Sequence, residues 1–254
     1  MPSTADAVRA PCMVASELLT LVAGVFSSVL CGFCECRPAP RTGATPILLI
    51  HGSGFNQSEW LPLRAFLATD PNIGSTYTVN LGGLCWHDRK SSIHDIAVDR
   101  VRPALELMFR ETGVRKAILV GHSLGGLIAA EVAENVAEAG EILKVISICS
   151  PFLGAPILEH AVKVCPSQET DQQMRVGSQY LQELGAGILR KDQLGKGARY
   201  YHIGSRMDAL VPGNQAVLAL SHEQRCCIYN GIEGHYSVVL SPRLWRQVYE
   251  WILE

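Results

Sequence analysis

The stretch AILVGHSLGGLIAAEVAENVAEAG, residues 117–140, decides the fold. Its first four residues form an uncharged apolar run, which is typical of a strand buried on both faces of a parallel sheet. From Leu124 onward, apolar residues recur at four-residue spacing among several alanines, and this pattern predicts a helix with Gly140 as its C-terminal cap. Ser123 therefore lies at a turn between a buried strand and a helix.

Glycines at positions 121 and 125 flank this serine in the pattern Gly-x-Ser-x-Gly. Because glycine has no Cβ, the strand and the helix can approach closely and expose the hydroxyl on a sharp turn. The helix N-terminus would also direct its amides and dipole at negative charge on a substrate oxygen. A chance glycine-serine turn is the alternative, but the motif's strand-turn-helix context is present on both sides. The pattern predicts that Ser123 is a nucleophile.

Composition restricts the class of protein. The chain has 254 residues, of which 48% are hydrophobic, and this length suits one substantial domain. The net charge is −2 without long blocks of like charge, so nothing indicates a nucleic acid or an acidic partner. The run CGFCEC, residues 31–36, lacks the second Cys or His pair of a zinc site, and we expect neither metal nor cofactor.

The nine cysteines do not form an obvious disulfide framework, because their number is odd. Cys149, Cys226 and Cys227 lie in runs that we predict to be buried strands, where a free thiol behaves as a small hydrophobe. This favours a reducing, intracellular compartment.

The N-terminal run LLTLVAGVFSSVLCGFC, residues 18–34, carries no charge and has the minimum length of a membrane-spanning helix. A cleaved secretory signal is poorly supported, since the preceding residues lack a basic region. Three interpretations stay open: a membrane anchor, with acylated cysteines as reinforcement; an apolar helix packed on the domain; or an uncleaved targeting signal. Residues 37–45 resemble a linker, so we divide the chain into 1–45 and a folded domain at 46–254.

From Pro46 onward, strand and helix patterns alternate. Such alternation predicts an α/β fold with about six strands in a mainly parallel sheet and helices on both faces. The predicted strands span residues 46–50, 76–81, 117–120, 144–149, 199–204 and 225–230, and the predicted helices include 60–69, 93–112 with a kink at Pro103, and a closing helix from Ser241 and Pro242. Residues 153–198 form either a lid over the site or an ordinary crossover helix with loops.

A serine nucleophile needs a base within reach and a carboxylate that orients this base. In parallel sheets the site forms at the carboxyl ends of the strands. Asp208 follows the strand predicted at 199–204, and His235 follows the strand predicted at 225–230. The chain order Ser123, Asp208, His235 is the order of α/β-hydrolases. Glu233 is the alternative acid, although two residues is a poor spacing for bonding the same imidazole.

The other histidines are weaker candidates for the base. His122 adjoins the serine but should project away from it, which favours a packing role. His202 lies within a predicted strand and is expected to be a satisfied core histidine. The remaining histidines, which have no matching position, are His51, His87, His94, His160 and His222.

Acyl transfer also requires hydrogen-bond donors for the oxyanion. The amide of Leu124, directly after the nucleophile, is one candidate. The second should come from HGSGF, residues 51–55, where glycines permit close backbone approach. We choose the Ser53 amide, with Gly54 or Phe55 as fallback.

These motifs together resemble the α/β-hydrolase superfamily, and within it the small lipase-like members. The resemblance runs from about residue 46 to the end of the sequence and also includes SPFLGAP at 150–156, DALVP at 208–212 and Gly234 before the histidine. It implies a carboxylic ester hydrolase with a reduced sheet, in which Ser123 is acylated, His235 transfers the proton and water deacylates the enzyme. SPFLGAP is similar to a segment lining the site in lipases, and MRVGSQYLQEL, residues 174–184, to the helix that follows it. No pattern matches the calcium site of some bacterial lipases.

Two classes of function remain. The first is a serine esterase or lipase acting on a small-molecule or lipid ester. Thioesterase and amidase are related activities that would use the same triad. The second is a catalytically silent protein of this fold that binds a lipid or a partner. The presence of all three triad candidates and both oxyanion segments favours the enzyme. The apolar N-terminus and the lid interpretation favour a lipidic substrate and membrane association.

Overall fold

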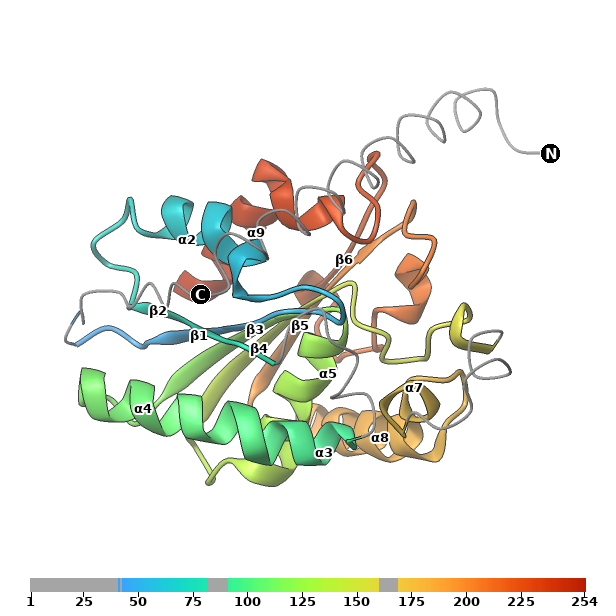
Figure 1. Ribbon diagram of the computed structural model, residues 1–254, viewed down its shortest axis with the longest axis horizontal. Coiled ribbons are helices and arrows are strands. Elements are labelled where there is room, and N and C mark those ends of the chain that lie inside the picture. The colour runs from blue at the N-terminus through green and yellow to red at the C-terminus, as the bar shows by residue number, and fades with distance from the viewer. Residues whose placement is uncertain (1–40, 42, 82–90, 160–168) are drawn as a thin grey trace.

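The computed structural model describes residues 41, 43–81, 91–159 and 169–254 (Figure 1). Within these residues, six strands form one sheet with the order β2-β1-β3-β4-β5-β6, and every neighbouring pair is parallel. The strands are β1 (Ile47–Ile50), β2 (Thr76–Val79), β3 (Ala117–His122), β4 (Ile142–Ile148), β5 (Arg199–Ser205) and β6 (Cys226–Tyr229). The six-stranded parallel sheet expected from the sequence is confirmed.

Helices cover both faces of the sheet (Figure 1). One face carries α2 (Leu61–Leu67) and α9 (Pro242–Leu253), and the other carries α3 (Ile93–Ile96), α4 (Arg102–Thr112), α5 (Leu124–Glu131) and α8 (Gln179–Gln193). The alternation of side chains along a strand explains these two cores. On β3, Ile118 and Val120 pack with the first group of helices, whereas Leu119 packs with the second. This double burial is why the strands carry so little charge.

Shorter elements connect these helices and strands. They are η1 (Gln57–Trp60), α7 (Glu169–Gln173), η5 (Gly213–Gln215), η6 (Glu223–Arg225), η7 (Ser237–Leu240) and two π-helical turns, η3 (Ala97–Val101) and η4 (Val132–Val136).

The π-helical turns correct two helix predictions. The helix after Ser123 ends with η4, whose C-cap Ala137 has an extended backbone and donates its amide to Val132. Gly140 therefore does not cap the helix, and its positive φ of 85° serves the turn before β4 instead. The helix predicted at 93–112 is interrupted by η3, and Pro103 lies in the first turn of α4. The change from π-helical to α-helical hydrogen bonding thus occurs directly before Pro103, which has no amide hydrogen to donate.

The three cysteines named above are only partly in buried strands. Cys149 is buried but lies one residue beyond β4, with a left-handed φ of 48°. Cys226 and Cys227 are half-buried, because β6 is an edge strand of the sheet. The interpretation of these two residues as buried was wrong.

The segment 153–198 contains a crossover helix. Helix α8 lies between β4 and β5 in the chain and packs on the same face as α4. It begins at Gln179 after the N-cap Ser178, so the helix expected over 174–184 starts later than the resemblance implied. Residues 160–168 lie outside the described residues, and a lid there stays a prediction.

The N-terminal predictions for residues 18–34 and 31–36 also fall outside the described residues. In the part of the chain that the structure describes, no helix has both the length and the apolar character to cross a bilayer. The described chain begins with Arg41, whose guanidinium donates to the carbonyls of Asp70 and Ile73 and so fastens the chain before β1.

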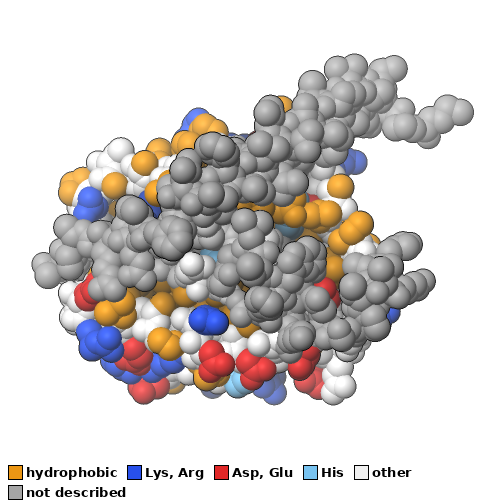
Figure 2. All heavy atoms as spheres, viewed as in Figure 1, with side chains coloured by type: hydrophobic (Ala, Val, Ile, Leu, Met, Phe, Trp, Pro, Cys, Tyr) orange, Lys and Arg blue, Asp and Glu red, His pale blue; other side chains and the backbone are white. Residues whose placement is uncertain are grey.

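The surface shown in Figure 2 carries charges of both signs. Acidic and basic side chains lie next to one another along its lower edge, where Figure 1 shows α3 and α4. This mixture agrees with the small net charge of −2.

Candidate functional site

Ser123 occupies a strained turn between β3 and α5. Its φ of 54° and ψ of −125° lie in a region that residues with a side chain rarely adopt, at a cost of about 1–3 kcal/mol. The adjacent glycines make the turn sterically feasible. A Cβ on Gly121 would overlap with the backbone of Gly125, and a Cβ on Gly125 would overlap with the carbonyl oxygen of Ile50. The local sequence therefore forces the serine to the carboxyl end of β3.

The structure brings the three predicted side chains together. Asp208 lies in the loop after β5 and His235 in the loop after β6, so both reach the end of the sheet where Ser123 lies. The His235 Nε2 atom is 2.9 Å from the Ser123 Oγ atom, and its Nδ1 atom is 2.7 Å from Oδ2 of Asp208. Asp208 and His235 are both buried, which strengthens their interaction.

The second oxygen of Asp208 fixes the carboxylate in place. Its Oδ1 atom accepts the backbone amides of Leu210 at 2.9 Å and Val211 at 2.7 Å. Since a carboxylate only accepts, the Nδ1 atom of His235 carries the proton of the neutral ring. The lone pair on Nε2 then faces the serine hydroxyl, as a general base requires.

The alternative acid and base do not reach this position. The Oε1 atom of Glu233 accepts a hydrogen bond from the hydroxyl of Ser241. The Nδ1 atom of His202 is hydrogen-bonded to the hydroxyl of Ser147 at 2.7 Å, and the ring packs against Phe152. Burial lowers the pKa of His202 to about 3, so the ring is neutral. Its Nε2 atom has no hydrogen-bond partner among the described residues, so this core histidine is satisfied at one nitrogen only.

Of the other histidines, His94 pairs with Glu131 at the C-terminal end of α5, away from Ser123. His222 lines a separate cavity. His87 and His160 lie outside the described residues.

The segment 51–55, which carries the candidate oxyanion donors and which we call the oxyanion loop, lies against Ser123. A Cβ on Gly52 would stand 3.0 Å from the Cβ of Ser123. The Gly52 carbonyl accepts from the His51 Nδ1 atom at 2.8 Å and from the Phe55 amide at 3.4 Å. Because a trans peptide directs N–H opposite to C=O, the Ser53 amide points away from these partners.

This arrangement distinguishes the candidate oxyanion donors. The Phe55 amide is engaged in the turn, which disfavours that fallback. The Ser53 amide makes no hydrogen bond within the described part of the chain, and Gly54 adopts a left-handed φ of 81° in the same turn. Leu124 is the first residue of α5, so its amide has no intrahelical acceptor. Ser53 and Leu124 therefore stay the candidate donors.

A buried pair behind the site was not found from the sequence. The side chains of Glu59 and His122 are each 1% exposed, and the Glu59 Oε2 atom lies 3.4 Å from the His122 Nδ1 atom. The His122 Nε2 atom donates to the backbone carbonyl of His235 at 2.9 Å. Burial, the largest single effect, lowers the pKa of His122, but the Glu59 carboxylate, the His235 carbonyl and the Asp208 charge together outweigh it, and the pKa is raised. His122 is thus buried, as its expected packing role requires, and it also contacts the backbone of His235.

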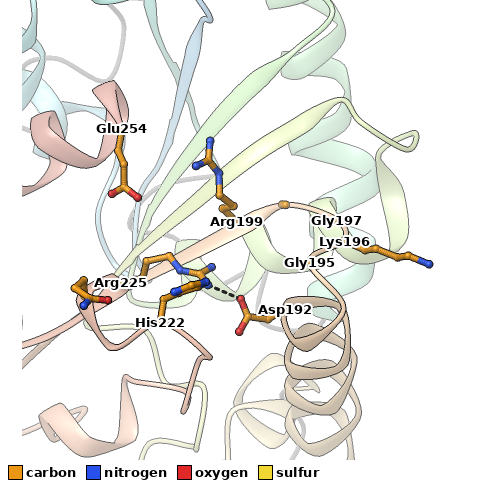
Figure 3. Close-up of a pocket in the computed structure, with 10 residues that line it drawn as sticks. Asp192, Gly195, Lys196, Gly197, Arg199, His222, Arg225 and Glu254 are labelled. Carbon is orange, nitrogen blue, oxygen red and sulfur yellow. Dashed lines mark ion pairs between the residues drawn. The ribbon is translucent and has the colours of Figure 1, made fainter.

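One cavity lies at the opposite end of the sheet. It has a volume of about 300 Å³ and is lined by Arg199, at the start of β5, and by Arg225, just before β6. Figure 3 shows that Arg225 and His222 point toward Asp192. Arg225 forms an ion pair of 2.8 Å with this aspartate, so its charge is already compensated. Within the described residues, no cluster of three His, Cys, Asp or Glu side chains could hold a metal ion.

Comparisons with known proteins agree with this fold. The family model described as "Alpha/beta hydrolase family" matches residues 47–252. The mature form of lipase BlEst2 from Bacillus licheniformis is 16% identical with a TM-score of 0.59, and the match covers 85% of this chain and 93% of that chain. An esterase from Thermogutta terrifontis is 14% identical with a TM-score of 0.53 and coverages of 84% and 91%. The hydrolase olei00960 from Oleispira antarctica is 15% identical with a TM-score of 0.52 and coverages of 84% and 92%. No curated protein sequence matches the chain.

Proposed function

We propose, since the chain belongs to the alpha/beta hydrolase family, that it is a serine carboxylic ester hydrolase. The observation that carries the proposal is the continuous hydrogen-bonded line from Ser123 through His235 to Asp208, with distances of 2.9 and 2.7 Å. Nucleophile, base and orienting carboxylate thus stand in the order that acyl transfer needs.

The chemistry follows from these contacts. His235 accepts the proton of the Ser123 hydroxyl at Nε2 while the Oγ atom bonds to the ester carbonyl carbon. The amides of Ser53 and Leu124 would donate to the oxygen that becomes negative. His235 then returns the proton to the departing alcohol, and a water activated in the same way releases the acid. Asp208 stabilises the imidazolium in both steps.

Exposed apolar side chains near the site support an apolar acyl group. Leu153, Ile157 and Val176 are 45%, 49% and 47% exposed. A hydrogen bond of 2.9 Å from the Ala155 amide to the Met174 carbonyl holds their two segments together. The first segment follows β4, whose carboxyl end lies beside that of β3. An ester with a long acyl chain or a lipid ester would gain from this surface.

Hydrolysis of p-nitrophenyl esters of increasing chain length, with and without detergent, tests the proposal. We expect turnover that rises with chain length, and we expect Ser123→Ala to abolish both turnover and labelling by a fluorophosphonate probe. Ser221→Ala is the matched control, because this exposed serine donates its amide to Asp192 at the remote cavity. A folded wild-type protein that neither hydrolyses esters or thioesters nor reacts with the probe would support the silent binding protein instead.

A further inference from the structure

We infer that Glu59 and His122 form a positioning pair that holds the oxyanion loop and the backbone of His235 in register around Ser123. The inference rests on the proposed ester hydrolase function and assigns to it two residues that touch no substrate. The pair joins three segments far apart in the chain: η1, the end of β3 and the loop that follows β6.

The surroundings of the two ring nitrogens favour a doubly protonated His122, although the contact with Glu59 is an ion pair rather than a hydrogen bond. The His122 Nε2 atom faces a carbonyl oxygen, the backbone oxygen of His235, and must therefore carry hydrogen. The Nδ1 atom faces a carboxylate oxygen of Glu59 at 3.4 Å, where an unprotonated nitrogen would set its lone pair against negative charge. Since both side chains are 1% exposed, water does not screen this contact. The raised pKa of His122 agrees with an imidazolium.

Other ionisable groups face the same pair. His51 is buried beside it, and burial lowers the pKa of this ring, so it adds no positive charge. The charge of Asp208 acts on His122 in the same direction as that of Glu59. The ring of His235 lies 5.1 Å from that of His122, centroid to centroid.

Glu59 controls the oxyanion loop at its first glycine. Its Oε1 atom accepts the Gly52 amide at 3.3 Å, while the Gly52 carbonyl is held by His51 and Phe55. Both peptide groups that flank Gly52 are thereby fixed, and with them the direction of the Ser53 amide. The space beside Gly52 is filled by Ser123 and His122, since a Cβ there would lie 3.0 Å from the Ser123 Cβ atom and 3.1 Å from the His122 Nδ1 atom.

His122 supplies the second anchor of His235. Asp208 holds the imidazole ring, and His122 holds the backbone carbonyl of the same residue. Misplacing a reacting group by about 1 Å can cost about 100-fold in rate. Releasing this anchor should therefore lower kcat without changing how the substrate binds.

Three variants test the pair. Glu59→Ala and His122→Ala should each lower kcat by about 10- to 100-fold, with KM within about threefold of wild type. Glu59→Gln should retain kcat within about threefold, because the amide can accept from Gly52 and donate to a neutral His122. The double alanine variant should lose no more than the worse single variant, since the residues act as one unit.

All rates are expressed per active site titrated with the fluorophosphonate probe, so that misfolded protein is not counted. Glu131→Ala is the matched control, because Glu131 is equally buried and pairs with His94 at 2.8 Å away from Ser123. It should lower the melting temperature and leave kcat per site unchanged. The inference is overturned if the alanine variants at positions 59 and 122 behave like this control, or if their losses multiply in the double variant.

A second measurement does not depend on activity, and it separates the failure of the positioning pair from the failure of the ester hydrolase proposal. In ¹⁵N-labelled protein, both nitrogens of His122 should show the imidazolium signature at pH 7, and Glu59→Gln should convert the ring to the form protonated at Nε2 alone. A wild-type His122 that is neutral at pH 7 would overturn the pair. If the signature is present but the protein hydrolyses nothing, the ester hydrolase proposal fails while the paired geometry stands.

Discussion

Replacing Asp208 with asparagine tests how His235 is oriented while preserving the surrounding loop. The Oδ1 atom of Asp208 accepts the amides of Leu210 and Val211, and the asparagine oxygen can keep both bonds. The other atom becomes an NH₂ group, which donates where the Oδ2 atom accepted from the His235 Nδ1 atom at 2.7 Å. The ring must then accept at Nδ1 and carry its proton on Nε2. That nitrogen would donate to Ser123 and could no longer take its proton.

The expected loss follows from this exchange of tautomers. An aspartate-to-asparagine change at the corresponding position of a serine protease lowers kcat by about 10⁴-fold. At about 1.36 kcal/mol per tenfold, this is about 5 kcal/mol of transition-state stabilisation. KM should change little because the Asp208 side chain is fully buried and faces the imidazole rather than the substrate.

The assay compares kcat of Asp208→Asn and wild type on the best p-nitrophenyl ester, with the free energy of unfolding measured in urea. Glu233→Gln serves as the control, since Glu233 bonds Ser241 and should be dispensable for the chemistry. The reasoning is refuted if Asp208→Asn keeps more than about a tenth of wild-type kcat, or if Glu233→Gln loses as much activity as Asp208→Asn.

Three further predictions concern stability. Gly125→Ala should lower the free energy of unfolding by more than about 2 kcal/mol, because its Cβ would overlap with the Ile50 carbonyl. Gly187→Ala in α8 should raise it by about 0.5–1 kcal/mol, because its Cβ would meet only an ordinary contact of 3.8 Å with the Glu134 carboxylate, and urea unfolding of both variants checks this. Lys144→Met should cost about 1–3 kcal/mol in the same assay, since the buried ammonium donates to two carbonyls at the end of α9 at 2.8 and 3.0 Å, and an unchanged stability would contradict that role. Burial lowers the pKa of His202 to about 3, so this residue binds a proton more readily in the unfolded chain. The free energy of unfolding should therefore fall by up to about 1.4 kcal/mol per pH unit as the pH drops from about 6.5 toward 3. His202→Gln should remove this contribution to the slope in acid titrations followed by circular dichroism.

The sequence indicated the sheet well because the signal for it is local. A strand buried on both faces must be apolar over four to seven residues, and a strand-to-helix turn this tight must place glycine at positions 121 and 125. Helix ends were less predictable. The choice of Ala137 over Gly140 depends on a π-helical turn that the residue composition does not indicate.

The candidate site was predictable only in part. Chain order pointed to Ser123, Asp208 and His235, and the structure places them within hydrogen-bond distance, while their catalytic roles stay predictions. Nothing in the sequence connected Glu59 to His122, because the two residues lie 63 positions apart and come together only in the buried interior of the folded chain.

What the sequence by itself determined is the order of the elements and the residue types that can sit at their ends, because apolar periodicity and glycine sterics act between near neighbours. Only the tertiary structure decided which polar groups meet. Because the strands are parallel, the loops after β1, β3, β5 and β6 all lie at the carboxyl ends of the strands. Burial there excludes water, so that His235 bonds Asp208 whereas Glu233 bonds Ser241, and the buried His122 donates to the backbone carbonyl of His235.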